Sequence, residues 1–145
     1  MKIESSFRSR LQIQLRFKDI DAMGHVNNAN HLSYFELARV HYFNALLGPE
    51  LDWNRQGIIL ARVEIDYKQP ILLSERVEVE CRVSRLGNSS FEMEYRIVAC
   101  GADAEFHVAA MGKSVQVCFD YEQGVSITMP GQWREKVLAF ESAGD

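Results

Sequence analysis

The sequence has few of the features that mark nucleic-acid-binding, membrane-spanning or secreted proteins. It carries 16 lysines and arginines against 20 aspartates and glutamates, for a formal net charge of −4. Phosphate binding normally needs a basic patch, and the arginines here are dispersed among glutamates, so nucleic acid is not expected as a partner. No apolar run approaches the roughly 18 residues of a membrane span, so no membrane association is expected. The first residues also lack the hydrophobic core of a signal peptide.

Cysteine is scarce too, which limits disulfide and metal chemistry. The three cysteines, Cys81, Cys100 and Cys118, are odd in number and show no C-x-x-C spacing. All three fall in strand-like segments, so we expect buried free thiols. A chain without disulfides suits a reducing compartment, and we therefore expect a cytoplasmic protein.

Low-complexity tracts, internal repeats and linkers are absent from the sequence as well. The 145 residues are 47% hydrophobic and 25% charged, which is ordinary for a globular protein. Because nothing marks a boundary, residues 1–145 are expected to form one domain.

Apolar residues that alternate with polar ones predict strands. The pattern covers residues 11–18, 61–68, 77–83, 91–97 and 105–119. In the last segment the apolar phase changes near Gly112, which predicts a bulge or bend. A helix is expected over residues 29–47, with Gly48-Pro49 as its stop, and a short helix over residues 130–141.

The order of these elements predicts an α+β fold. Short connections between long strands favour an antiparallel sheet. The helix over residues 29–47 is apolar on most sides and should be largely buried. A strongly curved sheet wrapped around that helix would supply the cover it needs.

The most informative stretch is the polar loop between the first strand and the long helix. Residues 19–31 contain two aspartates, two histidines and three asparagines. A junction between a strand and a helix offers rigid supports on both sides and free N–H groups at the helix start, which is what an active site needs.

Two segments carry a family pattern. Residues 16–28 read RFKDIDAMGHVNN and residues 34–39 read YFELAR, which combines a D-x-D pair, a glycine and a helix with an aromatic-Glu-x-Ala-Arg signature. The chain resembles the hotdog-fold acyl-CoA thioesterases, and most closely the branch that includes 4-hydroxybenzoyl-CoA thioesterase. The resemblance implies a five-stranded antiparallel sheet wrapped around one long helix.

The resemblance also implies an assembly. Two protomers would join edge to edge as a homodimer through the strand near residues 57–68, with the active sites at the interface. Two such dimers would make a homotetramer. The apolar run at residues 58–61 supports this expectation, because an apolar strand edge needs a partner.

The resemblance assigns chemistry to the polar loop. Asp21 would attack the thioester carbon or act as general base on water, and the sequence leaves both routes open. The backbone N–H of Asn28, at the helix start, would polarise the thioester carbonyl. Gly24 would let the backbone approach the thioester. His25 matches a histidine of acyl-carrier-protein thioesterases, but Met23 stands where those enzymes carry asparagine, so the role of His25 stays open.

Further residues are candidates for substrate binding. The acyl group would contact apolar residues of the helix and of the partner's sheet, for which the candidates are Tyr34, Phe35, Trp53, Ile58 and Leu60. The nucleotide end of coenzyme A, which is part of the substrate, would contact surface charges, for which the candidates are Lys68, Arg85 and Lys113. No cofactor and no metal are expected.

The remaining polar residues have structural explanations. Asp19 would accept hydrogen bonds that brace the loop, and the side chains of Asn27 and Asn28 would cap the helix. His31 would be a packing residue. Glu36 and Arg39, three residues apart on the helix, would form an ion pair.

Alternative functions remain open at this point. One is hydrolysis of thioesters carried by acyl carrier protein, although a docking surface for that acidic protein would need a clear basic rim. Another is non-catalytic binding of acyl thioesters, which an aspartate at the position of Asp21 disfavours. The sequence does not fix whether the acyl group is aromatic, short or long.

Overall fold

A computed structural model describes residues 1–48 and 52–143. The elements are β1 (Ser9–Ile13), a 3-10 turn η1 (Phe17–Asp19), α1 (Asn28–Leu47), β2 (Gln56–Tyr67), β3 (Arg76–Leu86), β4 (Ser90–Cys100), β5 (His107–Asp120), β6 (Val125–Ser126) and α2 (Gly131–Ser142). Both expected helices are therefore confirmed. Gly48 follows α1 with a φ of 53°, whereas Pro49 lies outside the described residues.

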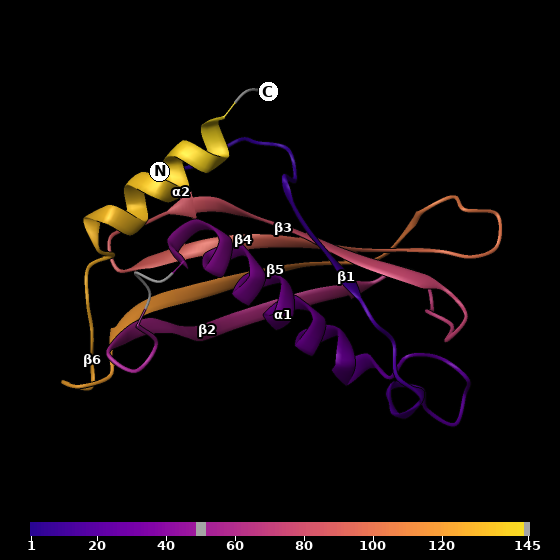
Figure 1. Cartoon of the computed structure of the whole chain (residues 1–145). Coiled ribbons are helices and arrows are strands. Elements are labelled where there is room, and N and C mark those ends of the chain that lie inside the picture. Colours follow the sequence, from indigo (N-terminus) through magenta and orange to yellow (C-terminus); the bar gives the residue numbers. More distant parts are fainter. Residues whose placement is uncertain (49–51, 144–145) are drawn as a thin grey trace.

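The strands form one antiparallel sheet in the order β1-β3-β4-β5-β2, and the two-residue β6 pairs with the end of β5. Figure 1 shows α1 lying across one face of the sheet, and α2 packed near one end of it. This is the sheet and helix that the resemblance implied. In the described chain β2 has no neighbour on its far side, so it is an edge strand.

The first strand is shorter than the sequence predicted. It ends at Ile13, which pairs with Val77 at the beginning of β3. Beyond that point the chain has no strand to pair with among the described residues, and Asp19 donates its N–H to the carbonyl of Arg16 at 2.9 Å. The alternating pattern therefore runs on into a 3-10 turn, where Phe17 is 86% exposed.

One face of α1 packs into the core against the sheet. Its buried apolar residues are Tyr34, Phe35, Ala38, Tyr42, Phe43 and Leu47. Phe35 stacks on Tyr95 of β4 with ring centroids 4.4 Å apart. The other flank carries Leu32, Leu37 and Val40, which are 40–51% exposed. The predicted burial on most sides is therefore wrong for the single chain, because the sheet covers only one side of the helix.

The predicted irregularity at Gly112 is misplaced. Gly112 keeps regular register with Ile65 and Tyr95, and the shifts occur beside Ala61 in β2 and Ala109 in β5. Glycine is needed at position 112 for a different physical reason. A Cβ at this position would overlap the Phe35 ring, so the absence of a side chain lets α1 approach the sheet closely.

Helix α2 is held in place by a buried carboxylate. Glu141 is 1% exposed and accepts hydrogen bonds from the Ser5 hydroxyl at 2.8 Å, the Tyr42 hydroxyl at 2.7 Å and the Val83 N–H at 2.9 Å. The three cysteines are buried and free, as predicted. No helix within the described ranges is both long and apolar enough to cross a membrane.

Replacement of Gly112 by alanine should destabilise the fold, because the Phe35 ring must move out of a packed core. We expect Gly112→Ala to lower the free energy of unfolding by about 1–3 kcal/mol, measured by urea denaturation. Gly101→Ala is the matched control, since a Cβ there has no heavy atom within 4 Å. Equal effects of the two substitutions would contradict this explanation of Gly112.

Candidate functional site

The polar loop before α1 folds into a tight turn around Asp21. Asp21 donates its N–H to the carbonyl of His25 at 2.9 Å and accepts from the N–H of Gly24 at 3.0 Å. Its Oδ1 atom accepts from the N–H of Met23 at 2.9 Å. The turn needs a φ of 82° at Gly24, which is why glycine stands there. One carboxylate oxygen of Asp21 is thus fixed in the loop, and Oδ2 accepts no hydrogen bond from the residues that the structure describes.

The base of the loop is held by Asp19, which is 1% exposed. Its carboxylate accepts from the Arg16 side chain at 2.9 and 3.2 Å, from the Arg16 N–H at 3.2 Å and from the Tyr34 hydroxyl at 3.1 Å. Its backbone carbonyl accepts from the N–H of Asn27 at 2.8 Å and from the side chain of Asn30 at 3.0 Å. The expectation that Asp19 braces the loop is confirmed.

At the start of α1 one backbone donor stays open. The side chain of Asn27 caps the helix by accepting from the N–H of Ala29 at 3.0 Å, and the Asn30 N–H bonds to the carbonyl of Asn27 at 2.9 Å. Within the described residues, the N–H of Asn28 has no acceptor, and its side chain makes no capping bond. The first turn of a long helix therefore offers a free donor in a region of partial positive charge.

A surface cavity brings four of the predicted site residues together. Asp21, His25, Asn28 and Lys68 all line it, and the other lining residues are Met23, Val26, His31, Tyr67, Gln69 and Pro70. Gly24 shapes the loop at its edge. Tyr67 was missed by the sequence reasoning, and His31 was assigned only to packing. The one available signal was that Tyr67 immediately precedes Lys68.

A second cavity lies farther along α1. It is lined by Glu36, Arg39, Val40, Trp53, Ile58, Leu60 and Gln116, and so includes three of the candidates for acyl binding. Glu36 and Arg39 form no ion pair within the described ranges. Instead, Arg39 donates to the Tyr95 hydroxyl at 3.0 Å, because its side chain turns toward the core. The expectation of a Glu36–Arg39 pair is therefore wrong.

Tyr34 and Phe35 lie apart from both cavities. Tyr34 is 3% exposed and donates its hydroxyl hydrogen to Asp19, whereas Phe35 is 1% exposed beneath Gly112. Both side chains therefore support the site from the core side of α1.

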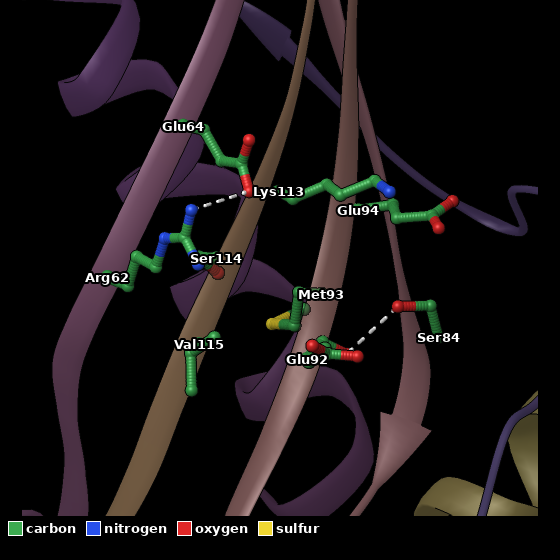
Figure 2. Close-up of a pocket in the computed structure, with 9 residues that line it drawn as sticks. All are labelled: Arg62, Glu64, Ser84, Glu92, Met93, Glu94, Lys113, Ser114 and Val115. Atoms are coloured by element: carbon green, nitrogen blue, oxygen red, sulfur yellow. Dashed lines mark hydrogen bonds and ion pairs between the residues drawn. The ribbon is translucent and has the colours of Figure 1, made fainter.

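Lys113 lies on the other face of the sheet. Figure 2 shows it beside Glu94 on the side turned away from α1, in a cavity that also holds Arg62, Glu64 and Glu92. Arg85 lines a neighbouring cavity on the same side, together with Lys113 and Glu94. Of the three basic residues considered for coenzyme A, the structure thus places only Lys68 beside Asp21.

Comparison with known proteins identifies the family. A sequence model of the thioesterase-like superfamily matches residues 15–139. The chain belongs to this superfamily. No curated protein sequence matches it.

Solved structures of thioesterases share the hotdog fold. A thioesterase from Thermus thermophilus, crystallised with coenzyme A and zinc, is 39% identical with a TM-score of 0.79, over 94% of this chain and 96% of that one. A predicted thioesterase from Bacillus stearothermophilus is 29% identical with a TM-score of 0.77, over 88% and 92%. A DHNA-CoA thioesterase from Staphylococcus aureus, 22% identical with a TM-score of 0.76 over 88% and 87%, supports the fold alone.

The site of this thioesterase-like protein shows no obvious metal centre. In the part of the chain that the structure describes, no group of three or more His, Cys, Asp or Glu side chains is arranged to hold a metal ion.

The charges around the loop follow from burial and hydrogen bonding. Burial alone would raise the pKa of Asp19, but the hydrogen bonds from Arg16 and Tyr34 outweigh it and hold that pKa below its ordinary value. Burial lowers the pKa of His31, although the carbonyls of Asn27 and Asn28 oppose the shift. The net direction favours the neutral form of the His31 imidazole.

The lowered pKa of Asp19 predicts a pH-dependent contribution to stability. Its ionised form stabilises the fold fully above the ordinary aspartate pKa of about 3.9, and this contribution is lost as the pH falls through the lower folded pKa. We expect Asp19→Asn to lower the free energy of unfolding by about 1–3 kcal/mol at pH 7. The gap to wild type should narrow below about pH 4, in urea denaturation over a pH series.

The control for this series is Glu135→Gln, because Glu135 is exposed on α2, away from the loop and from β2. That substitution should leave stability unchanged to within about 0.5 kcal/mol. A gap for Asp19→Asn that stays constant down to low pH would show that the carboxylate charge is not what braces the loop.

Proposed function

We propose that the protein hydrolyses acyl-CoA thioesters to the free acid and coenzyme A. Asp21 is the nucleophile or general base, and the backbone N–H of Asn28 polarises the thioester carbonyl. The observation that carries this proposal is that Asp21 and Asn28 line one cavity, in a chain of the thioesterase-like superfamily, and that the Asn28 N–H has no acceptor among the described residues. Coenzyme A enters as part of the substrate, and no cofactor takes part.

The two routes differ in whether the Asp21 carboxylate bonds to the thioester carbon or takes a proton from water. As a nucleophile, its Oδ2 atom adds to the thioester carbon, the thiolate leaves, and water hydrolyses the resulting anhydride. As a general base, it removes a proton from water as that water adds to the same carbon, and the C–S bond of the tetrahedral intermediate then breaks to release the thiolate and the free acid. In both routes negative charge develops on the carbonyl oxygen, where the N–H of Asn28 stabilises it. One such donor typically contributes about 2.7–4 kcal/mol to lowering the barrier.

The other lining residues have supporting roles in this proposal. Lys68 offers a positive charge at the cavity mouth, suited to the phosphates of coenzyme A. His25 holds the loop through its carbonyl, which accepts from Asp21, while its ring lines the cavity.

The substrate site is completed by a second copy of the chain. The free edge of β2 exposes Ile59 and Leu60 by 38% and 46%, and the uncovered flank of α1 adds further apolar surface. If two β2 edges pair antiparallel, the end of one strand lies beside the start of the other. Tyr67 and Lys68 of one protomer then adjoin the partner's copy of the cavity lined by Ile58 and Leu60. The acyl group would enter that cavity.

The catalytic assignment predicts a specific pattern of variants. A panel of acyl-CoA, aryl-CoA and acyl-carrier-protein thioesters would be assayed by release of free thiol. We expect Asp21→Asn to reduce kcat/KM at least about 100-fold. Asn28→Ala should have a smaller effect, because it retains the backbone donor. His25→Ala tests whether the imidazole ring takes part in catalysis or in orienting the substrate.

The control for this panel is Glu135→Gln, an exposed carboxylate on α2 that does not line the cavity of Asp21. It should keep wild-type activity. Full activity of Asp21→Asn, or no cleavage of any thioester by wild type, would refute the proposed function. If only carrier-protein thioesters are cleaved, the carrier in the substrate is acyl carrier protein and not coenzyme A.

The assembly is tested by disrupting the β2 edge. We expect wild type to be a dimer or tetramer in gel filtration with light scattering. Leu60→Arg should give monomers with little activity, because a charge at the strand edge opposes pairing. Leu73→Arg is the matched control, with 44% exposure outside β2, and should leave the assembly intact. A wild-type monomer that is fully active would contradict a site shared between protomers.

A further inference from the structure

A tyrosine at the end of β2 is joined to the first turn of α1. The Tyr67 hydroxyl donates to the backbone carbonyl of Asn28 at 3.0 Å. This bond links two segments 39 residues apart in the sequence. Tyr67 is the last residue of β2, and its side chain lines the same cavity as Asp21.

The Tyr67 ring is itself supported by His31. The His31 ring meets it edge-on, with centroids 4.9 Å apart and an interplanar angle of 78°. His31 lies one turn after Asn28 and is only 3% exposed, so its position is set by the packing of α1. Its Nδ1 atom is buried without a geometrically good hydrogen-bond partner in the described part of the chain, so the edge-on contact with Tyr67 is the interaction of this ring that bears on the cavity.

The atom that Tyr67 holds is close to the proposed oxyanion donor. The carbonyl and the N–H of Asn28 flank the same Cα, so fixing the carbonyl limits rotation of the residue that bears the donor. Residues at a helix start fray easily, because their N–H groups lack partners within the helix. An oxyanion donor must nevertheless stay within about 2.7–3.1 Å of the developing charge.

We propose that Tyr67 is a positioning residue for the oxyanion donor. Its hydroxyl, supported by the His31 ring, ties the Asn28 carbonyl to the end of β2 and so keeps the Asn28 N–H directed into the cavity. This inference rests on the proposed function, and adds a residue that acts through Asn28. The hydroxyl has one hydrogen, and that hydrogen is given to Asn28, so Tyr67 does not donate to the substrate at the same time.

The test is the removal of one oxygen atom by Tyr67→Phe. In the otherwise wild-type enzyme, we expect kcat to fall about tenfold while KM stays nearly constant, because a misdirected donor weakens only transition-state binding. The direct readout uses Asp21→Asn, which on the proposed function should bind the thioester and cleave it only slowly. Infrared spectroscopy of a bound acyl-CoA with an isotope-labelled thioester carbonyl then reports how strongly that carbonyl is polarised.

The carbonyl stretch should move to lower frequency on binding to Asp21→Asn. The double variant Asp21→Asn/Tyr67→Phe should retain roughly half of that shift or less, with unchanged affinity for the ligand. Tyr121→Phe is the matched control. Tyr121 is 43% exposed, against 45% for Tyr67, and it donates to the backbone carbonyl of Ile58 at 3.0 Å near the opposite end of β2. It should change neither kcat nor the carbonyl shift.

The outcomes separate this inference from the proposed function. An unchanged carbonyl shift in the double variant, or a rise in KM without a fall in kcat, would overturn the role of Tyr67 and leave Asp21 and Asn28 as proposed. A bound thioester that shows no shift even in Asp21→Asn would overturn both the donor role of Asn28 and the inference built on it. Equal losses for Tyr67→Phe and Tyr121→Phe would mean that the effect is general to β2.

Discussion

The buried carboxylate of Asp19 is the interaction on which the rest of the site depends. The carboxylate accepts hydrogen bonds from Arg16 and Tyr34, and the backbone carbonyl of Asp19 accepts from the N–H of Asn27 and from the Asn30 side chain. These bonds tie the segment that follows β1, the polar loop and the first two turns of α1 into one unit. Buried polar groups are costly unless they are bonded, so this set fixes a single loop conformation. Asp21 and the open Asn28 donor take their positions from it.

Strand β2 connects the other parts of the molecule. Its start, with Ile58 and Leu60, lines the cavity assigned to the acyl group, and its end carries Tyr67 and Lys68 beside Asp21. Its free edge is also the surface assigned to the second protomer. In this scheme the assembly, the acyl cavity and the direction of the oxyanion donor share one element. Disturbing the edge of β2 would therefore reach the chemistry as well as the dimer.

Much of the fold follows from the sequence pattern, and the departures have physical causes. Alternation located β3 to β5 well, because each pairs along nearly its full length, but it found only the second half of β2, whose first residues are a continuous apolar run. It failed beyond Ile13, where the strand loses its partner and the bonds to Asp19 form a turn instead. Gly112 was interpreted from the pattern of its own strand. The structure shows that a side chain there would overlap the ring of Phe35, which is far away in the sequence. The periodicity of a sequence predicts the type of element, but it does not identify the distant residue that packs against a given position.

The sequence alone determined the element order and the antiparallel sheet, since these follow from periodicity and from short connections. The motif with Asp21, Gly24 and Asn28 indicated the family by resemblance. Only the tertiary structure decided which residues join that motif. It brought Lys68 and Tyr67 from the end of β2 to the helix start, and it turned Tyr34 and Phe35 into the core. The physical reason is that helix rotation and strand register together set where each side chain points, and long-range packing fixes both.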